Sequence, residues 1–416
     1  MTSFSKTDPD EARAGERRPS LAVLFSVIVV DLIGFGIVVP ILPFWAERFG
    51  ADGTTLGLLL ASHAGMQLVG APIWGRLSDR IGRRPVMLIT IAGTAVALLL
   101  LGFATSLYQL FLARLLSGLF AANISVATAY LTDVTDEEDR TRWMGMIGAS
   151  FAVGFTLGPP LGGLLTRVGD STPMTFAAGL AGLNFVWAWL RLREPAQRAS
   201  ARPGDYTSRF DVLRQPDIAR LCLVYFLFTL AVTQLETTFA FYMSHRFGFD
   251  ELGVAMVMLA MAIVMGGIQG GGMKRLAAKF QERRLVLSGL AGMTVAFAAV
   301  PLADSVAWLM LPLALAAIGR ALAQPPMMSL VSLFADERSR GIVMGVFQSS
   351  ASAARVVGPI AAGLLYDVDA AWPYHAAAGL TAFGFVLALA VRERGDAGEG
   401  VARDDDGGQG SGDGRA

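Results

Sequence analysis

The chain has 416 residues, of which 54% are hydrophobic and only 16% are charged, and its formal net charge is zero. Soluble domains carry about 25% charged residues, so this composition excludes a soluble globular protein of this length. The single cysteine, Cys222, excludes a disulfide framework and a cysteine metal site.

A polar segment, residues 1–20, opens the chain, and apolar stretches of membrane-spanning length, about 20 residues, follow it. In chain order we predict twelve spans at 21–44, 54–74, 86–104, 107–131, 143–165, 173–190, 217–243, 251–273, 285–303, 305–333, 341–365 and 371–391. Only helices satisfy their backbone hydrogen bonds within one apolar segment. The sequence therefore predicts an all-α integral membrane protein with twelve transmembrane helices.

Two polar segments divide and end the helical region. Residues 191–216 form the longest connecting loop and separate an N-terminal bundle of six helices (21–190) from a C-terminal bundle of six (217–391). The tail, 392–416, is rich in Gly and Asp, and we expect it to be disordered.

The basic residues are distributed unequally between the two sides of the predicted membrane. Of 34 Lys and Arg, 28 lie in the N-terminal segment, the inner loops and the tail, and the loops of the other side hold only Arg48, Arg167 and Arg246. Basic loops stay in the cytoplasm. We therefore expect a cell inner membrane protein with both termini in the cytoplasm.

An internal repeat relates the two bundles at a spacing of 200 residues. Residues 136–165 and 336–365 are identical at eleven of thirty positions without a gap. Parallel repeats of this kind are typical of transporters that hold their substrate between two halves, near the middle of the membrane.

Four stretches carry a family resemblance. They are DLIGFGIVVPILP (31–43), GRLSDRIGRRP (75–85), LARLLSGLFAA (112–122) and GFTLGPPLGG (154–163). In this order they resemble the motifs of the major facilitator superfamily, drug:proton antiporter-1 branch, and the chain is similar to bacterial tetracycline and multidrug efflux proteins. The resemblance implies two pseudo-symmetric six-helix bundles and proton-coupled export by alternating access.

Two departures argue against tetracycline as the substrate. Tetracycline exporters carry an aspartate in span three and a histidine in span eight. This chain reads TAVALLLLGF (94–103) and ELGVAMVMLAMAIVMGGIQGG (251–271) in these spans. The second copy of the loop motif, GGMKRLAAKFQERR (271–284), also lacks the aspartate and the final Gly-Arg-Arg-Pro.

Ionisable residues within the spans are the candidates for proton coupling. Asp31 in span one lies roughly 16 Å from the inner surface and Arg114 in span four roughly 20 Å from it, at ~1.5 Å per residue. We expect them to share a pocket in which Arg114 modulates proton binding by Asp31; the alternative is a static buried pair that anchors the two spans. Glu236 in span seven is predicted either to pair with Arg355 of span eleven or to face the cavity.

Polar and aromatic residues in the spans complete the predicted substrate cavity. Besides Asp31, Glu236 and Arg355, the predicted lining is Phe35, Gln67, Asn123, Gln234 and Phe239. A polar residue of this kind is more often a contact between helices, and Arg320 is interpreted mainly as an anchor near the cytoplasmic side.

The loop between spans two and three is predicted to act as a conformational latch. Its residues are Gly75, Asp79, Arg80, Gly82, Arg83 and Arg84. The arginines alone are explained by topology, but Asp79 is not. The family resemblance implies that this loop contacts span eleven when the cytoplasmic side is closed.

Small residues in span five form a predicted helix-packing motif. They are Gly154, Gly158, Pro159, Gly162 and Gly163, with Gly358 and Pro359 as the copy in span eleven. Small residues at four-residue spacing let helices approach closely. The resemblance implies a tight contact between the two halves, and ordinary packing is the alternative.

These features predict a proton-coupled antiporter that exports small amphipathic compounds, such as drugs. A transporter of one metabolite and a non-transporting membrane sensor are the alternatives. No phosphate loop, metal-ligand cluster or nucleophile motif occurs, so we expect no enzyme, cofactor, metal or nucleic-acid partner. The expected partners are a small molecule, protons and lipid, and the expected state is a monomer.

Overall fold

A computed structural model describes residues 9–135, 137–195, 212–335 and 339–391, with 9–22, 137–142, 144, 145 and 148 described as backbone only. The N-terminal half contains α1 (Pro9–Arg48), α2 (Gly53–Ile81), α3 (Arg83–Gly102), α4 (Leu107–Phe120), α5 (Asn123–Val134), α6 (Glu137–Leu165) and α7 (Thr172–Arg191). The C-terminal half contains α9 (Pro216–Phe247), α10 (Glu251–Gly267), a π-helical turn (Ile268–Gly272), α11 (Met273–Lys279), α12 (Glu282–Ala299), a 3₁₀ turn (Val300–Leu302), α13 (Val306–Leu333), α14 (Arg340–Val368) and α15 (Trp372–Leu389). The all-helical prediction is confirmed for these residues.

The predicted spans all fall on helices. By length and composition, ten stretches of the described chain qualify as membrane spans, and the apolar part of α6, Ala149–Leu165, is shorter. The eleventh predicted span lies on α14, which is not among these ten stretches. Two predicted spans are interrupted: span four breaks at residues 121–122 between α4 and α5, and span eight passes through the π-helical turn between α10 and α11. The chain is a multi-pass membrane protein.

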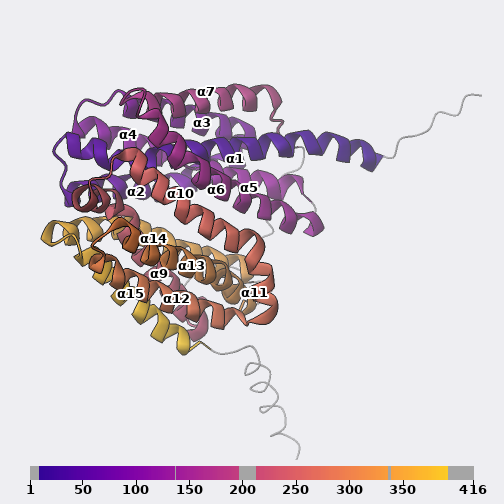
Figure 1. The fold of residues 1–416 in the computed structure, drawn as a ribbon. Coiled ribbons are helices and arrows are strands. Elements are labelled where there is room, and N and C mark those ends of the chain that lie inside the picture. Colours follow the sequence, from indigo (N-terminus) through magenta and orange to yellow (C-terminus); the bar gives the residue numbers. More distant parts are fainter. Residues whose placement is uncertain (1–8, 136, 196–211, 336–338, 392–416) are drawn as a thin grey trace, which may run out of the picture.

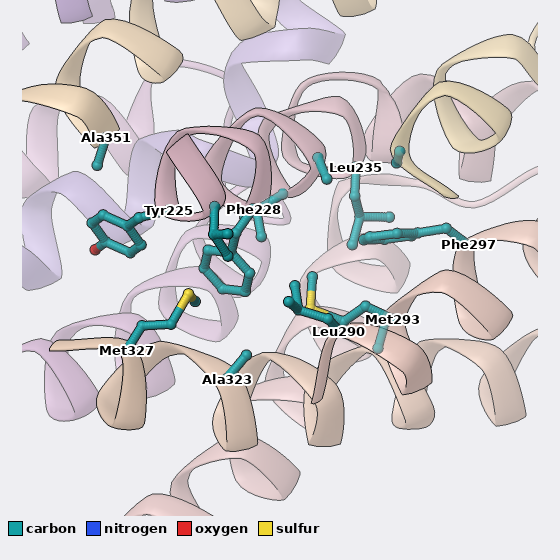
Figure 2. Packing of buried hydrophobic residues seen from close by; sticks show 14 of the residues in the cluster. Tyr225, Phe228, Leu235, Leu290, Met293, Phe297, Ala323, Met327 and Ala351 are labelled. Atoms are coloured by element: carbon teal, nitrogen blue, oxygen red, sulfur yellow. The ribbon is translucent and has the colours of Figure 1, made fainter. Parts of the chain in front are cut away.

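Each half is built around its first helix. In the N-terminal half α1 packs against α6 and α7, and in the C-terminal half α9 packs in the same way against α14 and α15. In the C-terminal half a core of large apolar side chains joins α9 to α12 and α13, and Figure 2 shows Tyr225 and Phe228 of α9 facing Met327 of α13 and Leu290 of α12. Close van der Waals packing of such side chains holds the helices of one half together in the membrane.

The halves meet at one end of the molecule, which we call the outer end because its loops are those with few arginines. There α2 packs on α14 and α6 packs on α10. In Figure 1 these helices meet at the left, whereas the start of α1 and α11 lie apart at the right, which we call the inner end. The described part of the chain also enters at α1 and leaves after α15 on this inner side (Figure 1).

Hydrogen bonds and ion pairs join the halves at the outer end. The Asp367 carboxylate at the end of α14 accepts bonds from the Gly53 and Thr54 backbone N–H groups at 2.7 and 2.8 Å and from the Thr54 hydroxyl at 2.6 Å. Arg48 donates to Glu251 at 2.8 Å, and Arg167 donates to Asp250 at 2.9 Å. His245 lies 2.6 Å from Glu47.

The glycines of α6 contact both halves, which corrects the predicted role of this motif. A Cβ on Gly158 would lie 2.6 Å from the Gly36 Cα, and Gly154 and Gly162 also face α1, within their own half. Gly163 alone of the motif faces α10, where a Cβ would lie 2.9 Å from the Leu252 Cα. Most of the motif therefore joins α6 to α1, and only its last glycine joins the halves.

The copy of this motif in α14 behaves in the same way. Gly358 packs against Thr233 of α9, in its own half, whereas the Pro359 carbonyl contacts Gly57 of α2 in the opposite half. Gly363, the repeat partner of Gly163, meets Gly53 at the start of α2. The internal repeat thus gives the outer end two equivalent close contacts between helices.

Candidate functional site

Asp31 lies at the break in span four rather than beside Arg114. The Asn123 side-chain amide, in the first residue of α5, donates a hydrogen bond of 3.0 Å to the Asp31 carboxylate. Asp31 is half-buried and Asn123 is 1% exposed, and the Asn123 side-chain oxygen has no hydrogen-bond partner within the described residues. The structure therefore joins two residues of the predicted cavity, from α1 and α5, and gives Asp31 an uncharged partner.

Side chains of α2 donate hydrogen bonds to backbone carbonyls at the break in span four. The Trp74 indole N–H donates to the Leu119 carbonyl at 2.7 Å, and the Gln67 amide donates to the Ala121 carbonyl at 3.1 Å. Carbonyls at a helix end have no intrahelical partner, and buried ones need a donor. Gln67 supplies this donor, so its observed contact is with another helix.

Arg114 is buried on the other side of the break. Its guanidinium is 5% exposed, and its Nε atom has no hydrogen-bond partner among the described residues. Next to it, the His63 ring of α2 lies 2.9 Å from the Ser117 hydroxyl, and α2 and α4 approach closely where Gly118 meets the His63 backbone. The shared pocket predicted for Asp31 and Arg114, and the alternative of a static buried pair, are thus replaced by separate contacts, with Asn123 and around His63.

The C-terminal half contains a pocket with three ionisable residues. Glu236 of α9 forms an ion pair with Arg320 of α13 at 2.7 Å, and Arg355 of α14 lines the same pocket. Of the two alternatives for Glu236, the pair with Arg355 is not formed, because Arg320 takes the place of Arg355; Glu236 does line the pocket, but it is paired there. Arg320 reaches Glu236 since α13 runs beside α9, and the anchor predicted for it toward the cytoplasm is replaced by this contact.

The pocket is small and partly open to solvent. Its wall consists of residues from α9, α13 and α14, including Tyr225, Phe228, Thr229, Gln324, Glu236 and Arg355. Ligand sites in proteins occupy roughly 300–1,000 Å³ and combine apolar walls with a few polar groups. In this conformation the pocket is much smaller than such a site, so its polar groups can form only one part of a larger binding surface.

Three other predicted cavity residues have different positions. Gln234 is 1% exposed, and its amide donates to the Gly358 carbonyl at 3.3 Å, so it joins α9 to α14. Phe239 is 6% exposed and belongs to the core of its half. Phe35 is 37% exposed and contacts the rings of His63 and Phe155, each at a centroid distance of 5.9 Å. Of the three, Phe35 alone has a substantial accessible surface.

The predicted latch is mostly helical. α2 continues to Ile81 and α3 begins at Arg83, so Gly82 alone separates the two helices, with φ of 114°. This φ suits glycine only, and a Cβ here would lie 2.7 Å from a Glu194 carboxylate oxygen.

The charges of the latch bind acidic residues within the N-terminal half. Arg83 pairs with Asp79 at 2.6 Å and with Asp133, at the end of α5, at 2.8 Å. Glu194, which follows α7, accepts bonds from the Arg83 and Arg84 backbone N–H groups at 2.7 and 2.9 Å. The contact with span eleven that the resemblance implies is not among these bonds.

Sequence reasoning missed Asp133, Glu194 and Asp367. Glu194 lies at the inner end of span six among several arginines, and that isolated negative charge was the available signal; Asp133, at the inner end of span four, is followed by four further acidic residues and had no such signal. Asp367 had a clearer signal, because the 200-residue repeat places it opposite Arg167. Both residues contact the start of a helix in the other half, near Gly53 and at Asp250 respectively.

Comparison with known proteins places this geometry in a family. A sequence model of the Major Facilitator Superfamily matches residues 24–276 and 272–407. The chain is 30% identical over 356 residues to the class B tetracycline resistance protein of Escherichia coli, covering 84% of this chain and 88% of that protein. It is 29% identical over 374 residues to multidrug resistance protein 1 of Bacillus subtilis (strain 168), covering 89% and 96%. Among solved structures, the human organic anion transporter TETRAN superposes with a TM-score of 0.67 at 26% identity, covering 89% of this chain and 99% of that one.

Proposed function

Since this chain belongs to the Major Facilitator Superfamily, we propose that it exports small amphipathic compounds in exchange for protons by alternating access. The proposal takes the substrate class from the names of its relatives, which describe resistance to tetracycline and to multiple drugs. It takes the mechanism from the position of Asp31 and from the way the two halves meet.

The observation that carries the proposal is the contact between Asp31 and Asn123 at the break in span four. A carboxylate inside the membrane is costly, and such residues mark ion or substrate pathways. Its partner here is a neutral amide, so Asp31 can gain or lose a proton without breaking an ion pair. We propose that Arg114, in the same half but on the other side of the break, influences this exchange through its charge.

Protonation of Asp31 can change the packing of α1 against α5 directly. The Asn123 amide donates to the carboxylate, and Asn123 is the first residue of α5. Protonation weakens a hydrogen bond that a charged acceptor strengthens. We propose that this loosens α1 from α5 at the break and favours movement of one half against the other.

The arrangement of the halves supports alternating access. The outer end is closed by the contacts of Asp367, Arg48 and Arg167 with the opposite half. We propose that these contacts break when the outer side opens, and that the latch at Gly75–Arg84 then contacts α14 at the inner end. Two six-helix bundles, 21–190 and 217–391, would move as units, with the connecting segment 191–216 between them.

We also propose that the protein lies in the bacterial inner membrane as a monomer with both termini in the cytoplasm. The unequal distribution of basic residues supports this orientation. Cysteines introduced near each end of the chain, followed by labelling with a membrane-impermeant reagent in intact cells, test it. Labelling of either end from outside would refute the orientation.

Purified protein in sealed vesicles tests the function. Under an imposed pH difference, a panel of labelled amphipathic compounds should move against its gradient, and vesicles without a pH difference should show only downhill movement. The Asp31→Asn variant should lose accumulation but keep downhill exchange. The matched control is Asp304→Asn, because Asp304 is 94% exposed in its side chain and lies in an outer loop.

The panel also separates the alternatives. Movement of one compound only would support a specific metabolite transporter in place of a drug exporter. Accumulation by Asp31→Asn at the wild-type level would refute Asp31 as the proton site. Absence of any proton-driven movement across the panel would refute the antiport itself.

A further inference from the structure

The pocket between α9, α13 and α14 carries more positive than negative charge. Its ionisable residues are Glu236, Arg320 and Arg355. Glu236 and Arg320 neutralise one another through their ion pair at 2.7 Å. Arg355 makes no hydrogen bond or ion pair with any described residue, so its guanidinium is the uncompensated charge of the pocket.

The guanidinium of Arg355 is accessible and lies on a transmembrane helix. Arg355 is exposed and lies midway along α14, between Arg340 and Val368. A cation at such a position normally pairs with an acid, a carbonyl or water in a cavity. Because no acid of the pocket is left to pair with it, a bound anion is the group that would complete this site.

Asp31 is not the anionic partner of Arg355. It lies in the opposite half, where Asn123 donates to its carboxylate. Arg114 is also in that half, and it adds positive rather than negative charge near the middle of the membrane. The ionisable groups at this depth therefore do not balance Arg355.

The remaining wall of the pocket combines two aromatic side chains, Tyr225 and Phe228, with Thr229, Val232, Thr233 and Gln324. The rings of Tyr225 and Phe228 lie nearly parallel, with centroids 6.1 Å apart and planes 12° apart. Tyr225 also stacks on Phe347 at 4.1 Å. Figure 2 shows Tyr225 and Phe228 side by side on α9. Both rings are only 2–3% exposed, so the wall offers a ligand mainly the Arg355 guanidinium, which favours a negatively charged group.

We propose that the exported compounds are amphipathic anions, and that Arg355 binds their carboxylate or sulfonate group. This inference rests on the proposed export function and names the substrate class of the same cavity. Glu236, held by Arg320, does not attract cations as a free carboxylate would. The anion and the proton bind to different halves, so their coupling passes through the movement of the halves and not through competition for one charge.

Three matched probes test the proposal: a naphthalene sulfonate, its uncharged sulfonamide and the corresponding trimethylammonium compound. The charges of the sulfonate and the ammonium do not change with pH. Wild-type protein in vesicles with an imposed pH difference should transport the sulfonate about tenfold faster than the ammonium compound. Arg355→Gln should lower the ratio of sulfonate to sulfonamide transport about tenfold, the effect of one lost bond to a charged group.

Two further variants exclude a general defect. Arg355→Lys keeps the positive charge and should keep the preference for the sulfonate, though with weaker binding because the bidentate geometry is lost. Arg275→Gln removes an exposed arginine of α11 outside the pocket and should transport all three probes at the wild-type ratio.

A third variant, Glu236→Gln, frees Arg320 from its ion pair and should tighten sulfonate binding.

Equilibrium binding of the sulfonate to protein in detergent distinguishes the two proposals. Binding that Arg355→Gln weakens, together with no proton-driven transport by the wild type, would uphold the anion site and refute the antiport. Proton-driven transport that favours the ammonium compound would overturn the anion site and leave the antiport standing. An Arg355→Gln protein with the wild-type sulfonate-to-sulfonamide ratio would also overturn it.

Discussion

Asp367 should hold the outer end closed, and its replacement by alanine should open it. The carboxylate accepts three hydrogen bonds from the start of α2, two of them from the Gly53 and Thr54 backbone N–H groups. In effect a residue of one half caps a helix of the other. Asp52, the N-cap within the chain, bonds only the Thr55 N–H at this helix start. The hydrogen bonds from Thr55 lower the pKa of Asp52, so this residue stays charged at neutral pH.

The size of the effect follows from these contacts. Removal of an N-cap side chain costs about 0.5–2 kcal/mol. Asp367 is exposed, so we expect its three bonds to contribute about 1–2 kcal/mol to the closed outer end rather than the larger value of buried charged bonds. That energy corresponds to a change of roughly 5–30-fold in the ratio of closed to open molecules.

Distances between spin labels at the outer end provide the assay. Phe103 and Leu302 are 68% and 67% exposed, lie in outer loops of opposite halves and are suitable label positions. Cys222 is buried and would be replaced by alanine, which leaves the two introduced cysteines as the only labelling sites. Asp367→Ala should increase the population with a long distance between the labels.

Asp369→Ala is the matched control. Asp369 lies two residues away and accepts a bond from the Ala371 N–H at 2.7 Å, within its own half. It should leave the distance distribution unchanged. If Asp367→Ala and Asp369→Ala gave the same distribution as the parent protein, the capping bonds would not hold the outer end closed.

Three further substitutions test the packing of the N-terminal half. Gly158→Leu should prevent folding, because even a Cβ at this position would lie 2.6 Å from the Gly36 Cα. The control Gly179→Leu should fold, because the space around Gly179 is open. The yield of monodisperse protein in detergent measures both outcomes. Glu194→Gln should lower the melting temperature, since it weakens the acceptor of two backbone bonds by about 1 kcal/mol. Gln67→Leu leaves a carbonyl without its donor at the break in span four and should cost about 1–3 kcal/mol of unfolding free energy; an unchanged melting temperature would contradict this.

The helical fold was predictable because it depends on long-range averages along the chain. Apolar stretches of a fixed length predict the spans, and the described helices fall on all of them. The helix ends were less predictable. α2 extends seven residues past its predicted end at Trp74, to Ile81, because Asp79, Arg83 and Glu194 satisfy one another's charges and backbone groups there. Such compensation depends on residues more than one hundred positions apart.

The site was only partly predictable for a related reason. Intramembrane charges could be found from hydropathy, and Asp31, Glu236 and Arg355 are all found in or beside polar sites. Their partners depend on helix rotation and on kinks, which depth along a span does not specify. The break before Asn123 turns this residue toward Asp31, and the chain around it contains no proline that would have indicated the break.

The packing residues are repeated between the two halves, whereas the residues that we propose to perform transport are not. Gly163 and Gly363 are equivalent in the repeat and make equivalent close contacts between the halves. The ionisable residues are not repeated: Asp31 corresponds to Ala231, and Arg355 corresponds to Phe155. A protein in which both halves kept the same charge would place like charges around one cavity, at a cost that rises in a medium of low dielectric constant. The repeat thus retains the glycines that pack the two halves together, whereas the charged residues differ between the halves. This difference allows the proposed proton-binding acid to lie in one half and the proposed anion-binding arginine in the other.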